Sequence, residues 1–307
     1  MISVIICTYN GEKYIVEQLK SIMDQTVMPD EVVIKDDCSN DRTVELCQEF
    51  INTNKLDWKV LVNDRNMGYR LNFVKGLEML KGDIIFMCDQ DDCWKTNKVE
   101  RMEEVINSNP HIISLASTVD RIDDKGEIIE RHLKHPYRKR NGLKQISEKE
   151  FFKFPQYMGM TMAIKKELVE EIDNEYADII SHDIFCNYYA IRKSGLFFLD
   201  EALTLRRSIG ENTSYLEGQT RLEEYNGNLQ LMSVDNNLNI LELYKKLDKT
   251  RNIQTSDILQ FNIDILRQRK EYLENKSVKG CLKYFPKMCK NRQLKQWMKD
   301  YKAIKMS

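Results

Sequence analysis

Short apolar runs alternate with segments of helical periodicity over the first hundred residues, and this alternation constrains the fold more than any other feature of the chain. The runs are rich in β-branched side chains and bounded by turn residues, as strands are. They lie at residues 3–8, 31–34, 58–62 and 83–87. Apolar strands separated by helices are typical of a parallel sheet covered by helices. We therefore expect a mixed, mainly parallel α/β sheet flanked by helices.

Polar clusters follow three of these predicted strands. Thr8 and Asn10 follow the first strand, Asp36 and Asp37 follow the second, and the acids of "CDQDD" follow the fourth. The carboxyl ends of parallel strands share one edge of a sheet, and α/β proteins bind ligands at that edge. We therefore expect the three clusters to lie together and to form a binding site.

The stretch "CDQDD" places Asp89, Asp91 and Asp92 within four positions. Close carboxylates repel one another, so a cation, solvent or a donor-bearing partner should offset their charge. Mg²⁺ and Mn²⁺ prefer oxygen ligands, and they bind through one or two carboxylates plus substrate phosphates. A metal site is therefore one interpretation. The other is a helix start that is capped by Asp91 or Asp92.

Two segments that follow predicted strands each have two interpretations. The pair Asp36-Asp37 suits hydrogen bonding to a base or to ribose hydroxyls, or it forms a solvated turn. The segment "NMGYRLN" (66–72) has a glycine turn at a predicted helix start. Such a turn suits the approach of a phosphate or ribose, or it is an ordinary turn.

Two later segments carry candidate groups for catalysis and anion binding. His182-Asp183 opens an apolar, aromatic segment, so Asp183 is either a general base or a helix cap. Arg206 and Arg207 precede a glycine turn in "LTLRRSIGENTS". Guanidinium groups suit a diphosphate, and the alternative is a pair of surface arginines.

The rest of the chain is less regular and then becomes helical. We expect strands at 112–119 and 197–205, a hairpin turn at 123–127, a basic loop at 131–145, and helices from about 220 and over 256–275. The segment "QYMGMTMAIKKELVEEI" predicts a strand through Gly159, Thr161 and Met162 that leads into a helix. The 307 residues are thus divided into a domain at 1–215 and a helical region at 216–307.

The last 31 residues form a strongly basic tail. Residues 277–307 contain eight Lys and one Arg against a single Asp, a net charge of about +8, although the whole chain is at −1. Apolar and aromatic residues such as Phe285 and Trp297 interleave with the lysines, a pattern that suits an anionic membrane surface. A solvated helix face is the alternative. Nucleic-acid binding is disfavoured because no recognition motif accompanies the charge.

Some classes of protein are disfavoured. No apolar run reaches the length that spans a bilayer, and the start "MISVIICTYN" does not resemble a signal peptide. The eight Cys form no CxxC pair and His is scarce, so we expect reduced cysteines and no zinc site. These features favour a cytoplasmic protein.

An ordered set of motifs resembles the family 2 glycosyltransferases of the GT-A fold, in particular their bacterial rhamnosyltransferase-like branch. The similar stretches are "VIICTYNGEKYIVEQLKSIMDQT", "VVIKDDCSNDRT", "NMGYRLNF", "GDIIFMCDQDDCWKTNKV", "MGMTMAIKKEL" and "SHDIF". The resemblance covers about residues 1–214. It implies a Rossmann-like domain that binds nucleotide sugars, followed by a C-terminal helical extension.

The resemblance also implies roles for individual residues. Asp89 and Asp91 would hold Mn²⁺ or Mg²⁺ and the donor diphosphate, Asp92 would lie beside the donor sugar, and Asp183 would be the catalytic base. Donor-binding positions would include Thr8, Tyr9, Asn10, Asp36, Asp37, Asn66, Gly68, Asn72, Gln90, Arg206 and Arg207. Positions on the acceptor side would be Trp94, Gly159, Thr161 and His182.

The implied activity is that of a metal-dependent, inverting transferase of the hexosyltransferase type in the synthesis of bacterial surface polysaccharide. Its donor would be a UDP- or dTDP-sugar, and its acceptor a glycan or a polyprenyl-linked oligosaccharide. It would act in the cytoplasm at the inner face of the membrane, which residues 277–307 would contact, and without nucleic acid. The alternatives are a sugar-nucleotide-binding pseudoenzyme or scaffold and a nucleotide-sugar pyrophosphorylase-like transferase.

The sequence departs from the family pattern at two places. Family members often carry "YRxHGxN" after the base, whereas this chain has "RRSIGEN", with Ile209 at the His position. Ile cannot ligate a metal, so this departure supports the pseudoenzyme alternative. Cys38 stands where Gly is usual.

Overall fold

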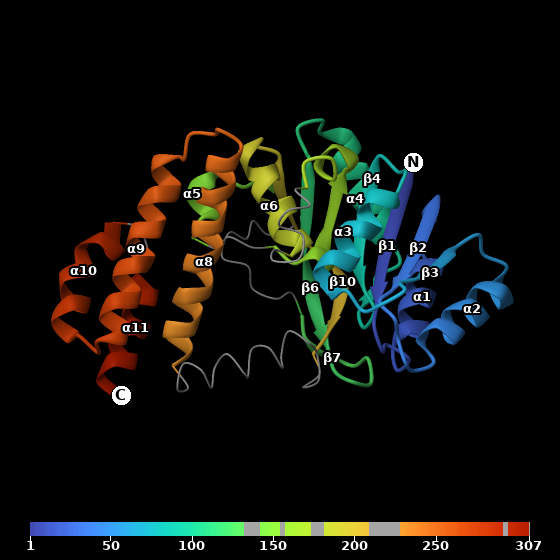
Figure 1. Ribbon diagram of the computed structural model, residues 1–307, viewed down its shortest axis with the longest axis horizontal. Helices are drawn as coiled ribbons and strands as arrows, with labels where there is room; N and C mark the ends of the chain where they lie inside the picture. The colour runs from blue at the N-terminus through green and yellow to red at the C-terminus, as the bar shows by residue number, and fades with distance from the viewer. Residues whose placement is uncertain (132–141, 154–156, 173–180, 209–227, 291–293, 307) are drawn as a thin grey trace. The chain divides into compact units, whose positions relative to one another are not determined.

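A computed structural model describes residues 1–131, 142–153, 157–172, 181–208, 228–290 and 294–306 (Figure 1). The chain divides into two compact units. The first comprises Met1–Ser147 and Gln156–Ser208, and the second comprises Glu148–Pro155 and Ile209–Ser307. The boundary predicted at 215/216 lies outside the described residues and stays a prediction.

In the described part of the first unit, ten strands form one mixed sheet with the central order β3-β2-β1-β4-β9-β6-β10-β5. β1, β2, β3 and β4 run parallel, β6 is parallel to β10, and β9 lies antiparallel between β4 and β6. The strands are β1 (Ile2–Thr8), β2 (Glu31–Asp36), β3 (Lys59–Val62), β4 (Ile84–Asp89), β5 (Cys93–Trp94), β6 (Ser114–Ile122), β7 (Ile128–Glu130), β8 (Leu143–Gln145), β9 (Met162–Lys165) and β10 (Leu196–Arg207).

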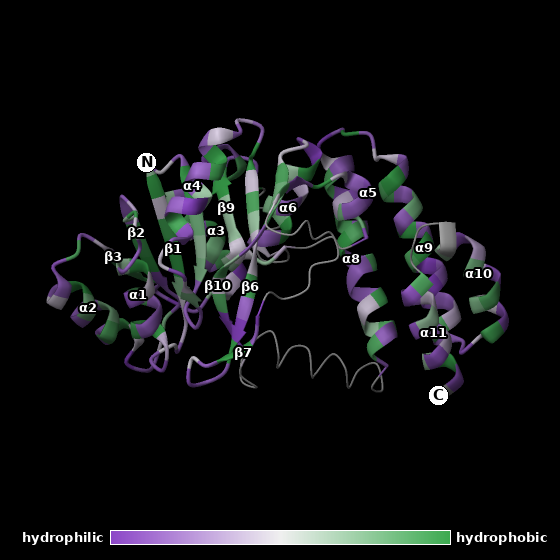
Figure 2. Cartoon of the chain, turned by 180° about the vertical axis from the view of Figure 1, so that it is seen from behind, coloured by the Kyte–Doolittle hydropathy of each residue, from purple (hydrophilic) through white to green (hydrophobic). Residues whose placement is uncertain are grey.

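Helices cover both faces of this sheet, which is why its central strands are apolar on both sides (Figure 2). Val4 and Ile6 of β1 join one core with α1, α2 and α4. Ile5 points to the other face, where a side chain at Gly76 of α3 would meet it within 2.6 Å. The helices of this unit are α1 (Ile15–Met23), α2 (Thr43–Asn54), α3 (Tyr69–Met79), α4 (Lys98–Ser108) and α6 (His182–Arg192).

The predicted strands and the hairpin turn at 123–127 are confirmed. The segment after residue 158 differs from its prediction. Gly159–Thr161 forms a 3₁₀ turn, in which Thr161 N–H and Oγ1 both donate to Met158 O, and β9 begins only at Met162. The helix predicted next is a single 3₁₀ turn at Lys166–Leu168. Most of the basic loop lies outside the described residues.

The second unit is helical in its described part, as predicted. It contains α5 (Glu148–Phe151), α8 (Leu229–Thr250), α9 (Asp257–Glu274), α10 (Val278–Lys290) and α11 (Leu294–Met306). Buried Arg269 of α9 forms an ion pair with buried Asp300 of α11 (2.9 Å), and Tyr272 donates to the same carboxylate (2.7 Å). The single acid of the basic tail therefore faces inward. None of the helices in the described ranges is both long and apolar enough to span a bilayer.

Candidate active site

The loops that follow β1 and β2 are tied together by side chains. Thr8 Oγ1 and Ser39 Oγ both donate to Asp36 Oδ2, at 2.8 and 2.6 Å. Asn10 has a left-handed φ of 49°; its N–H donates to Ser39 Oγ (2.8 Å), and its Oδ1 accepts from Asn40 N (2.9 Å). Asp36 is fully buried. It therefore holds the two loops together behind the predicted nucleotide site.

Asp37 organises the glycine turn that precedes α3. Its Oδ1 accepts from Met67 N (2.9 Å), and its Oδ2 accepts from Gly68 N (2.8 Å). Gly68 N also donates to Asn66 Oδ1 (3.0 Å), and the φ of Gly68 is 82°, which favours glycine. The structure thus brings Asp37, Asn66 and Gly68 together, but both oxygens of Asp37 serve the turn.

Asn72 lies in a buried amide network. Its Oδ1 accepts from Asn63 Nδ2 (2.9 Å), and its Nδ2 donates to Lys35 O (2.9 Å). Asn63 Oδ1 in turn accepts from Lys35 Nζ. Because both ends of the Asn72 amide are used within the protein, its influence on a donor would be through α3 and not through direct contact.

Gln90, between the acids of "CDQDD", clamps the end of β4 to the end of β1. Its Oε1 accepts from Tyr9 N (2.8 Å), and its Nε2 donates to Tyr9 O (3.0 Å). A side chain at Gly11 would collide with this amide. Tyr9 itself remains 45% exposed, so its ring is available to a ligand. The clamp joins the predicted nucleotide loop to the acid cluster, and we define that cluster as Asp89, Asp91 and Asp92.

The acid cluster is held under electrostatic strain. Burial and the charges of Asp91 and Asp183 raise the pKa of Asp89 to about 7. Burial also raises the pKa of Asp91, and burial together with the two neighbouring acids raises the pKa of Asp92 well above its ordinary value. In the described ranges, neither the carboxylate of Asp89 nor that of Asp91 accepts a hydrogen bond from another residue, although the backbone oxygen of Asp91 accepts from Arg207 Nε. A cation at this site would relieve the repulsion.

Asp92 does not start a helix. The nearest helix, α4, begins at Lys98, with Asn97 at its N-cap, so the capping interpretation of Asp91 and Asp92 is wrong. Instead, Asp92 Oδ1 accepts from Arg207 N (2.9 Å), while Oδ2 is buried without a hydrogen-bond partner in the described residues. A buried oxygen that lacks a donor is costly, so a hydroxyl or a cation is the group that this atom needs.

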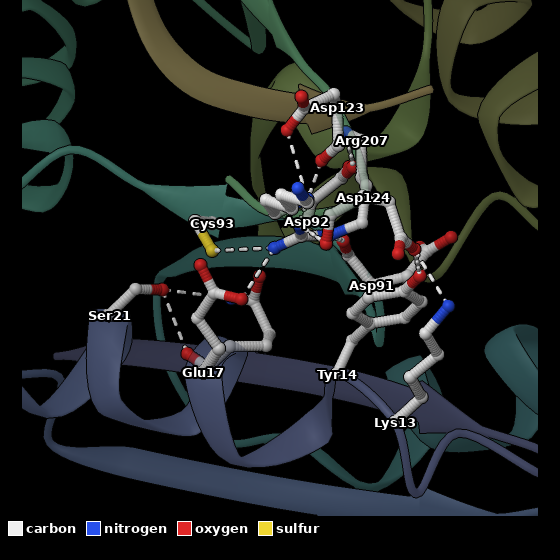
Figure 3. Close-up of polar contacts among 12 residues, drawn as sticks. Lys13, Tyr14, Glu17, Ser21, Asp91, Asp92, Cys93, Asp123, Asp124 and Arg207 are labelled. Carbon is white, nitrogen blue, oxygen red and sulfur yellow. Dashed lines mark hydrogen bonds and ion pairs between the residues drawn. The ribbon is translucent and has the colours of Figure 1, made fainter. Parts of the chain in front are cut away.

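Arg207 was predicted to bind the donor diphosphate, but its guanidinium group is hydrogen-bonded within the protein (Figure 3). Its side chain is buried, and it has five N–H donors. These donors reach Asp91 O (3.0 Å), Asp123 O (2.9 Å), Asp124 O (3.1 Å), Glu17 Oε2 (2.6 Å) and Cys93 Sγ (3.8 Å). With all five engaged, Arg207 braces the backbone of the acid cluster against α1 and the hairpin 123–124.

The charges of both arginines act on the acid cluster, that of Arg207 on Asp91 and that of Arg206 on all three acids. Successive residues of a strand point to opposite faces, so Arg206 and Arg207 diverge. Arg206 is half-buried, and its charge opposes the rise in the pKa of Asp89, Asp91 and Asp92. It therefore remains the candidate for the diphosphate.

Asp183 interacts electrostatically with the acid cluster, because its charge contributes to the raised pKa of Asp89. It stands in the first turn of α6, where its Oδ1 accepts from Ile184 N (2.8 Å) and from Ser181 Oγ. The N-cap of α6 is Ser181, so Asp183 is not the cap residue, although it satisfies one free N–H of the first turn. The interaction with Asp89, some 94 positions earlier in the chain, is not explained by capping.

All four predicted acceptor-side residues are buried, and two of them, Gly159 and His182, lie together at the start of α6. The ring of His182 stacks on Phe73 at 3.8 Å, and a side chain at Gly159 would meet His182 Nε2 within 2.6 Å. Burial lowers the pKa of His182, so the neutral imidazole is favoured. Thr161 and Trp94 are also buried. Gly159 and His182 therefore pack next to Asp183, whereas Trp94 belongs to the core that contains residues of α1 and α4.

Lys98, a residue for which no site role was predicted, is fully buried near the acid cluster. Its Nζ donates to Met160 O (2.7 Å) and Thr204 Oγ1 (3.0 Å), and it lies 4.1 Å from the centroid of the Trp94 ring. Its position in the stretch "GDIIFMCDQDDCWKTNKV", which carries part of the family resemblance, was the one sequence signal that could have singled it out.

The residues present fit a hard divalent cation. The described residues contain no group of three or more His, Cys, Asp or Glu that could hold a metal by themselves. Mg²⁺ and Mn²⁺ are usually bound by one or two carboxylates plus substrate phosphates, and Asp89 and Asp91 supply those carboxylates without competing donors. Ile209 lies outside the described residues, so the effect of the missing His stays a prediction.

Comparison with known proteins defines the class. The model of a family described as "Glycosyl transferase family 2" matches residues 3–173, which is more than half of the chain. The chain belongs to this family, and the resemblance seen in its motifs is confirmed.

Among individual relatives, a dTDP-rhamnosyl transferase, RfbG, of Shigella flexneri is 29% identical over 237 residues, covering 70% of this chain and 77% of the relative. An uncharacterized glycosyltransferase of Haemophilus influenzae is 32% identical over 127 residues, which is 41% of this chain and only 38% of the relative's length.

Solved structures confirm the GT-A fold. The structure of residues 1–349 of S. aureus TarS matches with a TM-score of 0.60 at 17% identity, covering 98% of this chain and 80% of that one. A mannosyltransferase of Pyrobaculum calidifontis, solved with GDP-Man and Mn²⁺, matches with a TM-score of 0.58 at 15% identity, covering 99% and 86%. At these identities the likeness concerns the fold alone.

Proposed function

We propose that the chain is an inverting glycosyltransferase in which Asp183 is the catalytic base and the acid cluster binds the donor. The observation that supports this proposal is the electrostatic interaction of Asp183 with Asp89, whose pKa the charge of Asp183 helps to raise. An acceptor hydroxyl that reaches Asp183 would lie next to the group that holds the donor diphosphate. A general base must lie within reach of the proton it removes, and we propose that an acceptor bound next to the donor would bring its hydroxyl to Asp183.

The reaction is a single displacement. The acceptor hydroxyl gives its proton to a carboxylate oxygen of Asp183, and its oxygen forms a bond to the anomeric carbon of the donor sugar. The bond from that carbon to the diphosphate oxygen breaks on the opposite face, and the electron pair leaves with the nucleoside diphosphate. The anomeric configuration is therefore inverted.

The remaining site residues bind and orient the donor. Asp89 and Asp91 would hold Mn²⁺ or Mg²⁺, which when bound stabilises the negative charge of the leaving diphosphate. Arg206 supplies a further positive charge to the same group. The unpartnered Oδ2 of Asp92 would accept a hydrogen bond from a hydroxyl of the donor sugar. The exposed ring of Tyr9 would pack on the nucleobase of the donor.

The donor we propose is a UDP- or dTDP-sugar, and the acceptor is a glycan or a polyprenyl-linked oligosaccharide in bacterial surface polysaccharide synthesis. The relative named as a dTDP-rhamnosyl transferase and the structure of TarS in complex with UDP-GlcNAc support this choice of nucleotide. A pyrophosphorylase-like reaction is disfavoured because no arginine- and lysine-bearing phosphate loop follows β1.

Binding of a nucleoside diphosphate should depend on metal. We expect UDP or dTDP at 100 times its Kd to stabilise the protein by about 2.7 kcal/mol when Mn²⁺ is present, and much less in EDTA. Differential scanning fluorimetry with UDP, dTDP and GDP measures this shift, with AMP as the control nucleotide. A melting temperature that no nucleotide changes in either condition would contradict the donor proposal.

We also propose that α10 and α11 contact an anionic membrane at its cytoplasmic face. Leu282 and Phe285 of α10 are 51% and 39% exposed, and Leu294 and Met298 of α11 are 45% and 48% exposed. Exposed lysines lie between them, giving the mixed colouring of these helices in Figure 2. Apolar anchors among lysines suit a surface of anionic lipid.

Replacing Leu282 and Phe285 with Ser should lower the partition coefficient onto vesicles of phosphatidylglycerol and phosphatidylcholine by about tenfold or more, because each side chain contributes roughly 1.5–3 kcal/mol when buried. Phe261→Ser is the matched control. Phe261 is 44% exposed on α9, between Asp257 and Asp264 on the same helix face. Equal vesicle binding by the double variant and the wild type would contradict the proposed membrane contact. Binding of the wild type to RNA would favour the nucleic-acid alternative.

A further inference from the structure

Lys98 is buried at a position where a positive charge is unfavourable. It is the first residue of α4, and its side chain is fully buried. The positive end of the helix dipole lies at this terminus, so a cation here is disfavoured. Removing an ammonium group from water is also costly unless it is paired and hydrogen-bonded. Burial accordingly lowers the pKa of Lys98 to about 7, against the opposing influence of Cys88, Asp92 and Asp89.

The three directions of the Lys98 ammonium are all used, and each leads to a different element. One N–H donates to Met160 O in the 3₁₀ turn Gly159–Thr161, and another donates to Thr204 Oγ1 on β10. The Trp94 ring of β5 takes the third side, with its centroid 4.1 Å from Nζ. β5 pairs with β10 through Trp94 and Thr204. Lys98 therefore joins the segment just after the acid cluster to the turn before β9.

That turn supports the proposed base. Gly159 lies so close to the imidazole of His182 that a side chain there would approach Nε2 within 2.6 Å, and it would lie 3.6 Å from Asp183 Cβ. A shift of the turn would therefore move the first residues of α6. The contacts run from Lys98 through Met160 and Gly159 to Asp183, without passing through any donor ligand.

We propose that Lys98 is a positioning residue that sets the placement of Asp183 relative to the acid cluster. This inference rests on the proposed function, because it assigns Asp183 to the acceptor and the acid cluster to the donor. Lys98 touches neither substrate. Its ammonium connects the turn Gly159–Thr161, which packs next to Asp183, to the strand pair β5–β10, which adjoins the acid cluster. A displacement of about 1 Å at such a site can cost about 100-fold in rate.

The test is Lys98→Met, which retains an unbranched apolar stem and removes the ammonium. Three quantities are measured: the Kd of dTDP (or of UDP, if the wild type prefers it) with Mn²⁺, the kcat of transfer from the matching dTDP- or UDP-sugar to a panel of octyl glycosides, and the melting temperature. We expect the Kd to stay within about threefold and kcat to fall by about 100-fold.

Arg269→Met is the matched control, because it removes a buried cation in the second unit, where Arg269 pairs with Asp300. It should lower the melting temperature without changing kcat below that temperature. If kcat of folded Lys98→Met equals that of the wild type, the proposal is overturned. If Lys98→Met does not fold, Thr204→Val is tested in its place, because it removes one acceptor of the Lys98 ammonium and keeps the side-chain shape. An unchanged kcat in Thr204→Val would also overturn the proposal. A wild-type chain that neither binds the nucleotides nor transfers sugar would instead sink the proposed function.

Discussion

Asp183→Asn is expected to reduce sugar transfer by at least about 100-fold, which is the lower end of what a positioned general base contributes. Asn has almost the same shape as Asp, and its side-chain oxygen can still accept from Ile184 N and Ser181 Oγ. It cannot take a proton from the acceptor hydroxyl. Nucleotide binding should therefore stay close to that of the wild type, and initial rates with a saturating donor measure the loss.

Asp257→Asn is the matched control, because Asp257 stands in the first turn of α9 as Asp183 stands in the first turn of α6. If Asp183 served only to support its helix, both variants would lose about 1 kcal/mol of stability or less and both would keep their activity. A wild-type rate in Asp183→Asn would mean that another group removes the proton. If the wild type itself showed no transfer, the scaffold alternative would be favoured instead.

Local sequence signals were sufficient for the fold of the first unit. The strand runs were recognisable because β1, β2 and β4 are largely buried on both faces and so contain the apolar runs 4–7, 32–34 and 84–88. Their polar ends could be expected to converge because parallel strands end at one edge. The 3₁₀ turn Gly159–Thr161 was not recognisable, since the apolar pattern of that segment suits a strand equally well and the turn is fixed by contacts with Lys98 and His182.

The roles of individual polar residues depended on distant partners. In the pair Arg206-Arg207, the strand alternation predicts that one side chain is buried, but not which one. The choice is made by Glu17 and the carbonyls of residues 123 and 124, which together satisfy Arg207. Gln90 likewise bonds the backbone of Tyr9, 81 positions away. The motifs therefore indicated where the site lies. Only the three-dimensional contacts distinguish the residues that are free to bind a ligand from those, such as Arg207 and Gln90, that hold other parts of the protein in place.

Asp91→Asn is expected to have opposite effects on stability and on activity. The raised pKa values of the acid cluster mean that its charged forms are disfavoured in the folded, metal-free protein. A carboxyl with a raised pKa contributes stability below its unfolded pKa of about 4, and that contribution is lost as the pH rises through the folded value, which is about 7 for Asp89. The metal-free wild type should therefore melt at a lower temperature at pH 8 than at pH 6 on account of this cluster.

Asn at position 91 removes one of the charges that raise the pKa of Asp89. The metal-free variant should therefore melt above the wild type at pH 8, with a smaller decline between pH 6 and pH 8. It should also lose the Mn²⁺-dependent part of nucleotide binding and about 100- to 1,000-fold of transfer, the range for removing one group that stabilises developing charge.

Asp124→Asn is the control for this experiment, because Asp124 is exposed and pairs with Lys13, outside the acid cluster. It should leave both the pH dependence and the response to Mn²⁺ unchanged. If Asp91→Asn instead lowered the stability of the metal-free protein at pH 8, Asp91 would be a structural acid with a favourable partner. The repulsion within the cluster would then not be the feature that a divalent cation relieves, and the donor site would have to be assigned elsewhere on the same edge of the sheet.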